Sequence, residues 1–322
     1  MSVRDLNKPA RHPAYEANRD TLLALFPLCL MAAFLYGLRP VVLLAAAAVT
    51  ARLCDRLAAR LRGLPRDTAE DSSVVHAVIL TLLLPAAVPY RVLILAVAVS
   101  VFVGKHVFGG WDQTPFHPAA LGYVVAAVSW PEQVSRYTAP FAPLGLSNAA
   151  AQAAGKTTAH VLSETGLPNI ASLDLWLGSW AGPMGATCTL VILAVAVFLL
   201  VRRRISAEPA LAFLAVCALM SLVYPRVVLA GRLEVLEYEL LSGAVLFGSV
   251  FLVCDPVTAP KTRRARIVYG LLCGFVTMMY RYYGSYELGI CFAVLLVNAF
   301  SGTLDRLCSR PGRVWKRRVS EQ

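Results

Sequence analysis

The sequence predicts an all-α, polytopic membrane protein. Of its 322 residues, 58% are apolar and only 15% are charged, whereas an ordinary soluble domain has about 25% charged residues. The mean hydropathy is +0.63, and several apolar runs approach the length needed to cross a hydrocarbon core of about 30 Å. This composition excludes a soluble enzyme and predicts several membrane helices.

Apolar runs bounded by charged residues, proline or glycine predict about ten membrane segments. In chain order they cover residues 21–37, 40–55, 73–88, 90–104, 118–130, 186–201, 209–225, 239–254, 266–281 and 287–303. A straight helix rises about 1.5 Å per residue, so the shortest of these runs cannot cross the bilayer unaided. The short segments are therefore expected to be tilted, broken or re-entrant.

The basic residues gather on one side of this arrangement. Both tails and every second connector, which ten crossings place on the same side, contain most of the 30 Lys and Arg residues. Because basic loops stay in the cytoplasm, both termini are predicted to be cytoplasmic. The net charge of +11 is then explained by basic residues in cytoplasmic loops. The basic residues are not interleaved with aromatic residues as in a nucleic-acid-binding surface, so nucleic-acid binding is not predicted.

The same assignment divides the chain into five regions. These are a cytoplasmic tail (1–20), a first membrane repeat (21–130), a non-cytoplasmic loop (131–185), a second membrane repeat (186–303) and a basic cytoplasmic tail (304–322). Loops longer than about 15 residues are usually functional or disordered. A chemical role is therefore expected on the far side of the membrane.

The two membrane regions resemble each other. Each contains a proline pair at the same spacing: Pro85 with Pro89, and Pro256 with Pro260. A further apolar run and then a basic residue follow each pair, Lys105 in the first half and Arg281 in the second. Because five segments per half is an odd number, the two halves cross the membrane in opposite directions and form an inverted repeat. In such folds, broken helices lie near the functional site. Alternatively, the proline pairs are short loops between hairpin helices.

Two regions of the sequence also resemble a known family. They are DSSVVHAVILTLLLPAAVP with VGKHVFGGWDQTPFHPAALGYVV, and SGAVLFGSVFLVCDPVTAPKTRRARIVYGLLCGFVTMMYRYYGSYELGICFAVLLVNAFSGTLDR. Both resemble the RnfD/NqrB family, whose members are membrane proteins of the Rnf ion-translocating ferredoxin:NAD oxidoreductase and of the sodium-translocating NADH:quinone reductase. The resemblance covers nearly the whole chain outside the tails and residues 131–175. The family's FNPA element reads FHPA here, with His117 in place of asparagine.

The resemblance implies a subunit of a redox-driven translocase in the bacterial inner membrane. Such a subunit carries flavin and passes electrons, coupled to Na⁺ or H⁺ movement, together with other membrane and flavoprotein subunits. It has no complete enzyme activity alone. No glycine-rich nucleotide-binding fingerprint occurs in the chain, so NADH must be oxidised by another subunit.

The resemblance further implies covalently bound FMN. Family members carry FMN on a threonine of a non-cytoplasmic loop, in a motif similar to D-x-x-S-x-A-T, where a flavin transferase forms a phosphodiester bond. The best match here, AAQAAGKT, assigns the attachment to Thr157, with Thr158 as the alternative and Lys156 beside the phosphate. Ala151 and Ala154 replace the acidic residue and the serine of the motif, and Lys156 replaces its alanine.

Four more residues are assigned to cofactor binding. Lys105 and Arg281 either extend to the membrane surface or bind the phosphate, ribityl chain or ring carbonyl of a flavin, including a second, non-covalent flavin such as riboflavin. Asp255 and Thr258 belong to DPVTAP. An ionisable group at membrane depth predicts a function, so Asp255 contacts an ion or a flavin ring edge. Alternatively, the cations of 261–264 balance it at the cytoplasmic surface.

The altered threonine motif leaves another function open. A chain that kept the fold and lost the cofactor would be a flavin-free transporter or scaffold subunit. Thr187, in the string MGAT, matches the glycine-rich start of the sixth segment better than the attachment motif. His76, His106 and His117 lie in three different segments, so no metal site is predicted.

Overall fold

A computed structural model describes residues 13–63, 71–110, 113–142, 144–146, 154–155, 171–225, 231–284 and 288–309. Within these ranges the chain is mainly helical. The strands of this described part are the two-residue β1 (Tyr137–Thr138) and β2 (Ala154–Gly155), which pair antiparallel. The helical architecture agrees with the predicted fold class.

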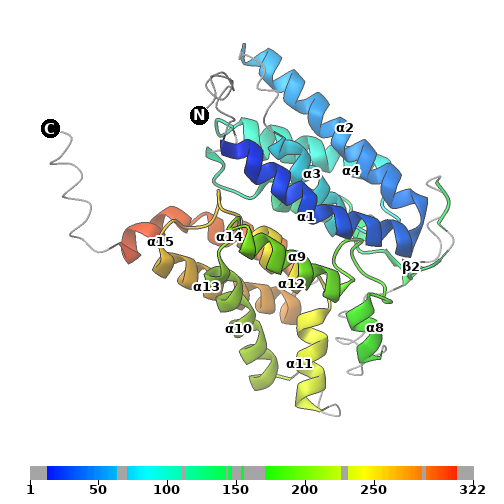
Figure 1. Ribbon diagram of the computed structural model, residues 1–322, viewed down its shortest axis with the longest axis vertical. Coiled ribbons are helices and arrows are strands. Elements are labelled where there is room, and N and C mark those ends of the chain that lie inside the picture. The colour runs from blue at the N-terminus through cyan, green and yellow to red at the C-terminus, as the bar shows by residue number, and fades with distance from the viewer. Residues whose placement is uncertain are drawn as a thin grey trace, which may run out of the picture.

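The helices of the first half form one group, with α1 at its edge (Figure 1). They are α1 (Pro13–Tyr36), α2 (Leu38–Leu61), α3 (Ser72–Leu83), α4 (Tyr90–Val101), the π-helical turn η2 (Phe102–His106), α5 (Pro118–Ser129) and α6 (Pro131–Val134). Helix α2 packs against α3 and α4, and α4 packs against α5. The turn from α1 to α2 is made by Gly37, whose φ of 75° favours glycine.

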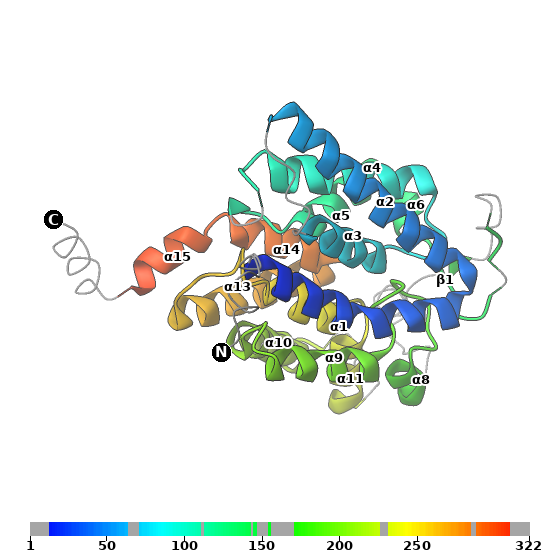
Figure 2. The same cartoon turned by 45° about the horizontal axis from the view of Figure 1, so that its top comes forward.

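The second half forms the other group, and both views show α1 between the two groups (Figures 1 and 2). Its elements are α8 (Ser172–Leu177), α9 (Thr189–Val201), α10 (Ala207–Val223), α11 (Arg232–Leu241), α12 (Val245–Gly248), the π-helical turn η5 (Ser249–Val253), α13 (Arg263–Tyr283), α14 (Gly289–Asn298) and α15 (Ser301–Cys308). Contacts of α1 with α9 and of α5 with α14 join the halves.

Helix length separates the membrane segments into three kinds. Among the described residues, Glu16–Tyr36 alone forms a straight helix that is long and apolar enough to cross a membrane. The count rises to three if each of two helix pairs, bent by 56° and 55°, is one span: Arg232–Leu241 with Val245–Val253, and Gly289–Asn298 with Ser301–Cys308. Four other apolar helices are shorter: Ser72–Leu83, Pro118–Ser129, Thr189–Val201 and Ala207–Val223. Ten crossings therefore stay a prediction.

Two glycines of α13 permit the extensive contact between α10 and α13. A Cβ atom at Gly270 would lie 2.3 Å from the carbonyl oxygen of Pro209, and one at Gly274 would lie 2.7 Å from that of Phe213. Both positions face α10, and small residues four apart let the backbones of two membrane helices approach closely.

We expect Gly270→Ala and Gly274→Ala each to lower the free energy of unfolding by about 1–3 kcal/mol, because the added methyl group must push the helices apart. Unfolding by sodium dodecyl sulfate from mild-detergent micelles measures the change. Gly302→Ala is the control, since a Cβ atom there meets nothing within 4 Å. Equal stability of all three variants would contradict the close contact.

Candidate functional site

The first candidate feature is the broken end of α3. The helix ends at Leu83, ahead of Pro85, so its last carbonyl groups lack the N–H donors of a following turn. The N–H groups of Gly185 and Met184 donate to the carbonyl oxygens of Leu82 and Leu84, at 2.8 and 3.2 Å. Such partners are required wherever a helix ends at membrane depth.

Arg39 binds the turn that follows α3. Its side chain is fully buried, with 0% exposed. Nε and Nη2 donate to the carbonyl oxygens of residues 86–88 at 2.8–3.3 Å, and the guanidinium lies 5.4 Å from the ring centre of Tyr90. Nη1 donates to the carbonyl oxygen of Gly145 at 2.9 Å. One cation therefore joins the helix break to the start of the predicted non-cytoplasmic loop.

Further hydrogen bonds fix the described part of this loop to the same place. The Tyr90 hydroxyl donates to the Leu146 carbonyl oxygen at 2.9 Å, and the Phe141 N–H donates to the Leu35 carbonyl oxygen at 2.7 Å. In addition, β1 pairs with β2. The chain on both sides of residues 147–153 is thus fixed to the first half of the molecule.

The residues predicted to hold covalent FMN, which are Lys156, Thr157 and Thr158, lie outside the described residues, so their role stays a prediction. They follow β2 directly in the sequence. The rival threonine, Thr187, is only 1% exposed, and its carbonyl oxygen accepts a hydrogen bond from Nε1 of Trp180 at 3.2 Å. A threonine this buried has no room for FMN, in agreement with its sequence interpretation.

The second candidate feature is the turn after η5, where Asp255 and Thr258 meet. Oδ2 of Asp255 accepts hydrogen bonds from the N–H and the hydroxyl of Thr258, at 3.0 and 2.8 Å. Two of the cations expected as alternative partners have other contacts. Lys261 Nζ donates to the carbonyl oxygens of residues 256–257 at 3.0 and 3.3 Å, and Arg263 pairs with an acid of α10 at 3.3 Å.

A cavity of about 60 Å³ lies between the two halves and borders this turn. Its lining includes Asn18 of α1, His76 of α3, His117 at the start of α5, Arg204 and Asp255. The rings of His76 and His117 are perpendicular, with centres 5.3 Å apart. These histidines belong to separate segments of the sequence, and the fold brings them together.

The hydrogen bonds of His117 define its tautomer. Nδ1 accepts from the Ala120 N–H at 3.4 Å and caps α5, so Nε2 carries the hydrogen and donates to the Phe251 carbonyl oxygen at 3.1 Å. In a π-helical turn, that carbonyl would bond to the N–H of residue 256, which is a proline without one. His117 therefore links the two halves by satisfying a carbonyl group that the turn leaves open.

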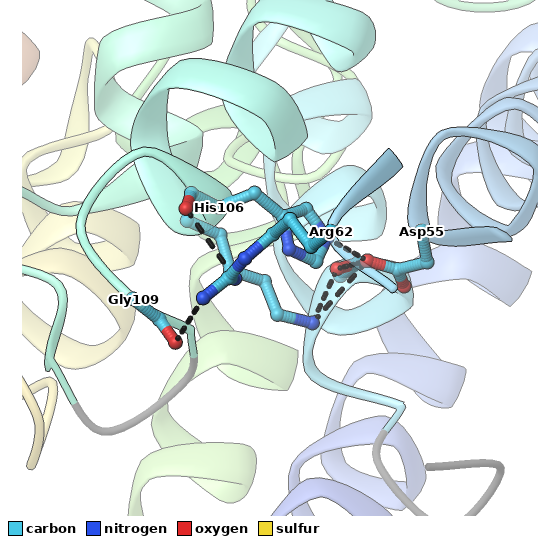
Figure 3. Close-up of polar contacts among 6 residues, drawn as sticks. Asp55, Arg62, His106 and Gly109 are labelled. Atoms are coloured by element: carbon cyan, nitrogen blue, oxygen red, sulfur yellow. Dashed lines mark hydrogen bonds and ion pairs between the residues drawn. The ribbon is translucent and has the colours of Figure 1, made fainter. Parts of the chain in front are cut away.

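Lys105 belongs to a cluster centred on Asp55 of α2, and Figure 3 shows Asp55 and His106 of this cluster. Oδ1 of Asp55 accepts from the Ser73 hydroxyl at 2.7 Å, His106 Nε2 lies 2.8 Å from it, and Lys105 Nζ lies 3.3 Å from it. Lys105 Nζ also donates to the Ser73 hydroxyl at 2.8 Å. Figure 3 shows the Arg62 side chain directed at the carbonyl groups of His106 and Gly109.

Arg281 has a comparable environment in the second half. Its Nε lies 2.9 Å from Oε2 of Glu239, Nη1 donates to the Glu239 carbonyl oxygen at 2.7 Å, and Nη2 donates to the Ser242 hydroxyl. The side chains of Arg281 and Glu239 are 6% and 1% exposed, and that of Lys105 is 4% exposed. The prediction that these cations extend to the membrane surface is therefore wrong for both.

Binding of flavin by Lys105 and Arg281 stays a prediction. Each cation is neutralised by a buried or half-buried carboxylate, so a flavin phosphate would have to compete with that partner. Sequence reasoning missed both acids, although each is an acidic residue at the border of an apolar run. No group of three or more His, Cys, Asp or Glu side chains among the described residues is arranged to hold a metal ion.

Comparison with known proteins places this architecture in a family. The family model of NQR2, RnfD and RnfE matches residues 10–312. The RnfD protein of the ion-translocating oxidoreductase complex of Pseudomonas aeruginosa (strain UCBPP-PA14) is 34% identical over 302 residues, covering 89% of this chain and 88% of the relative. The protein of the same name from Salmonella paratyphi A (strain ATCC 9150 / SARB42) is 28% identical, covering 95% of this chain and 96% of the relative. The one from Tolumonas auensis is 29% identical, covering 89% of this chain and 91% of the relative. The chain therefore belongs to the NQR2, RnfD, RnfE family, as its sequence motifs predicted.

Proposed function

We propose that this chain is the membrane electron-transfer subunit of an ion-translocating oxidoreductase complex of the bacterial inner membrane. The observation that carries this proposal is the match over residues 10–312 to a family whose relatives are named as members of such a complex. Other membrane and flavoprotein subunits would deliver and remove the electrons. The chain has no complete activity alone, because it contains no nucleotide-binding fingerprint.

We further propose ten membrane crossings in two inverted five-helix repeats, with both termini in the cytoplasm. The paired environments of Lys105 and Arg281 support this arrangement. In each half, a basic residue follows the proline pair, and a serine lies near the start of the helical segment that precedes it. Lys105 binds the hydroxyl of Ser73, and Arg281 binds the hydroxyl of Ser242. Each pair also includes a carboxylate. The same contact built twice is what a duplicated fold would produce.

Covalent FMN on the loop is the cofactor we propose. A flavin transferase would attach it to Thr157, or to Thr158, with Lys156 beside the phosphate. The position of β2 supports this, since β2 directly precedes Lys156 in the sequence and is fixed by its pairing with β1. Bound FMN would accept electrons from a two-electron donor and pass them one at a time to a one-electron acceptor, or the reverse. A second flavin, such as riboflavin, is proposed near Asp255 and Thr258, because Lys105 and Arg281 already have carboxylate partners.

Co-expression with a flavin transferase tests the attachment. The wild-type band is expected to fluoresce on a denaturing gel, because a phosphodiester bond survives denaturation, and Thr157→Ala is expected to abolish that fluorescence. Thr158→Ala is the matched control and should keep the fluorescence. Loss in Thr158→Ala alone would move the attachment by one residue, and a dark wild-type band would exclude covalent FMN.

A flavin-free transporter or scaffold of the same fold is the second candidate. It is favoured by the replacement of the acidic residue and the serine of the attachment motif with Ala151 and Ala154. The absorbance spectrum of the intact purified complex decides between the two. Without flavin bands assignable to this chain, the flavin-free function is favoured.

Ion translocation is proposed at the cavity between the halves. Asp255 is the acidic residue in the lining of this cavity, and it lies where a broken helix leaves polar groups away from regular structure. In transport proteins with inverted repeats, sites of this kind bind the coupling ion. Na⁺ and H⁺ are both compatible with a carboxylate at this position.

A further inference from the structure

The chemistry of the cavity suggests which ion this chain would move. The lining combines two imidazole rings, one carboxylate and one guanidinium. The guanidinium of Arg204 is paired with Asp20, at 2.6 Å from Nε to Oδ2, and also with Glu16 at 3.6 Å. This leaves His76, His117 and Asp255 as the titratable groups at the inner part of the cavity.

Two buried polar atoms in the lining need a partner from the cavity. Nδ2 of Asn18 makes no hydrogen bond with a described residue, and Asn18 as a whole is only 7% exposed. Nδ1 of His76 makes no hydrogen bond of normal geometry, although the ring interacts with the backbone of Ser72. An amide nitrogen donates, and an imidazole nitrogen can either accept or donate. A volume of about 60 Å³ has room for a few water molecules, which meet both needs.

The same atoms suit a hard cation poorly. Hard cations in proteins are bound by several oxygen ligands. In this cavity, Oδ2 of Asp255 already accepts two hydrogen bonds from Thr258. His117 contributes no oxygen, and both of its ring nitrogens are engaged in hydrogen bonds.

We propose that the cavity takes up protons, with His76 as the proton-binding residue and His117 as a positioning residue. This inference rests on the proposed function and specifies its ion. A ring nitrogen of His76 takes a proton from cavity water and later returns one to water, while no other bond forms or breaks. Electron transfer within the complex provides the driving force.

The groups around His76 act on its charge in opposite senses. Burial is the largest influence and disfavours a protonated ring, as do His117 and Lys105 of η2, whereas Asp255 favours it. His117 is held in one neutral tautomer by its two hydrogen bonds, and Arg204 is neutralised by its acids. Asp255 is therefore the group in the cavity lining that favours the proton-loaded ring.

Proteoliposomes that contain the whole purified complex test the inference. Electron transfer is started with the reductant of the complex, and a trapped pH dye and ²²Na⁺ report the ions moved. The wild-type complex should move protons in sodium-free buffer. His76→Gln should lower the protons moved per electron about five-fold or more and flatten the pH profile of proton movement. His76→Asn serves as a second variant if the first does not assemble.

Two comparisons separate proton binding from a structural role. Arg136→Met is the control, because Arg136 pairs with Glu132 at the surface, away from the cavity, and it should keep the wild-type ratio. His117→Ala should lower the ratio, and His117→Gln should restore it, because a glutamine amide can donate to the Phe251 carbonyl oxygen from about the position of Nε2.

The contrary outcomes are distinct. Sodium transport by the wild-type complex without proton transport would overturn the inference and leave the proposed function intact. A wild-type ratio in both His76 variants would also overturn it. A complex that transfers electrons and moves neither ion would overturn the proposed function as well.

Discussion

Replacing Arg39 with methionine is expected to prevent this protein from accumulating in folded form. The substitution removes four hydrogen bonds to carbonyl oxygens, three in residues 86–88 and one at Gly145. Residues 86–88 are buried, and a buried carbonyl group without a donor costs about 1–3 kcal/mol, so the loss at these three groups alone reaches into the 5–15 kcal/mol that typically separates folded from unfolded protein. Size-exclusion chromatography and the thermal unfolding midpoint in detergent measure the loss.

Arg52→Met is the matched control for this prediction. Arg52 lies on the same helix, its side chain is 60% exposed, and it pairs with Asp71 at 3.3 Å. Because exposed ion pairs contribute about 0–1 kcal/mol, this variant should remain folded. Arg39→Lys should be intermediate, since one ammonium group cannot reproduce the fork of a guanidinium. Arg39→Met as stable as Arg52→Met would refute the role assigned to Arg39.

The second large effect is expected at Arg281. Arg281→Met leaves the Glu239 carboxylate, which is 1% exposed, without its cation. Removing one partner of a buried ion pair typically costs about 3–5 kcal/mol, because the remaining charge is uncompensated. Detergent-induced unfolding of the purified protein, followed by tryptophan fluorescence, measures the change in the free energy of unfolding.

A double variant distinguishes lost pairing from lost packing. Arg281→Met combined with Glu239→Leu removes both charges, and we expect it to be more stable than Arg281→Met alone. Arg136→Met is the surface control, because Arg136 and Glu132 are 61% and 84% exposed in their pair. If the double variant were less stable than the single one, the buried charge would not be the cause.

The helices and their breaks could be predicted from the sequence because both depend on local chemistry. Apolar runs indicated helices, and the proline pairs indicated where α3 and the segment before Asp255 would end, since proline lacks an N–H. Asp255 and Thr258 are three residues apart, so their contact is also local. The family motifs predicted the family, which the match to residues 10–312 confirmed.

The contacts that complete the site were not predictable because they join distant parts of the chain. Arg39 looked like an ordinary basic residue of a short connector, and its carbonyl partners lie up to 106 residues away. The acids that neutralise Lys105 and Arg281 come from other helices. A single sequence has no periodic or compositional signal for pairs of this kind, and the contact of His76 with His117 was missed for the same reason.

The hydrogen bonds at the end of α3 also bear on how the protein is made. The carbonyl groups of Leu82 and Leu84 accept hydrogen bonds from Gly185 and Met184. These donors are synthesised roughly a hundred residues later, which takes about 5–20 s at ordinary synthesis rates. Until then, the nascent first half has open carbonyl groups in or near the bilayer. The end of α3 therefore gains its last two hydrogen-bond donors only after residues 184–185 have been made.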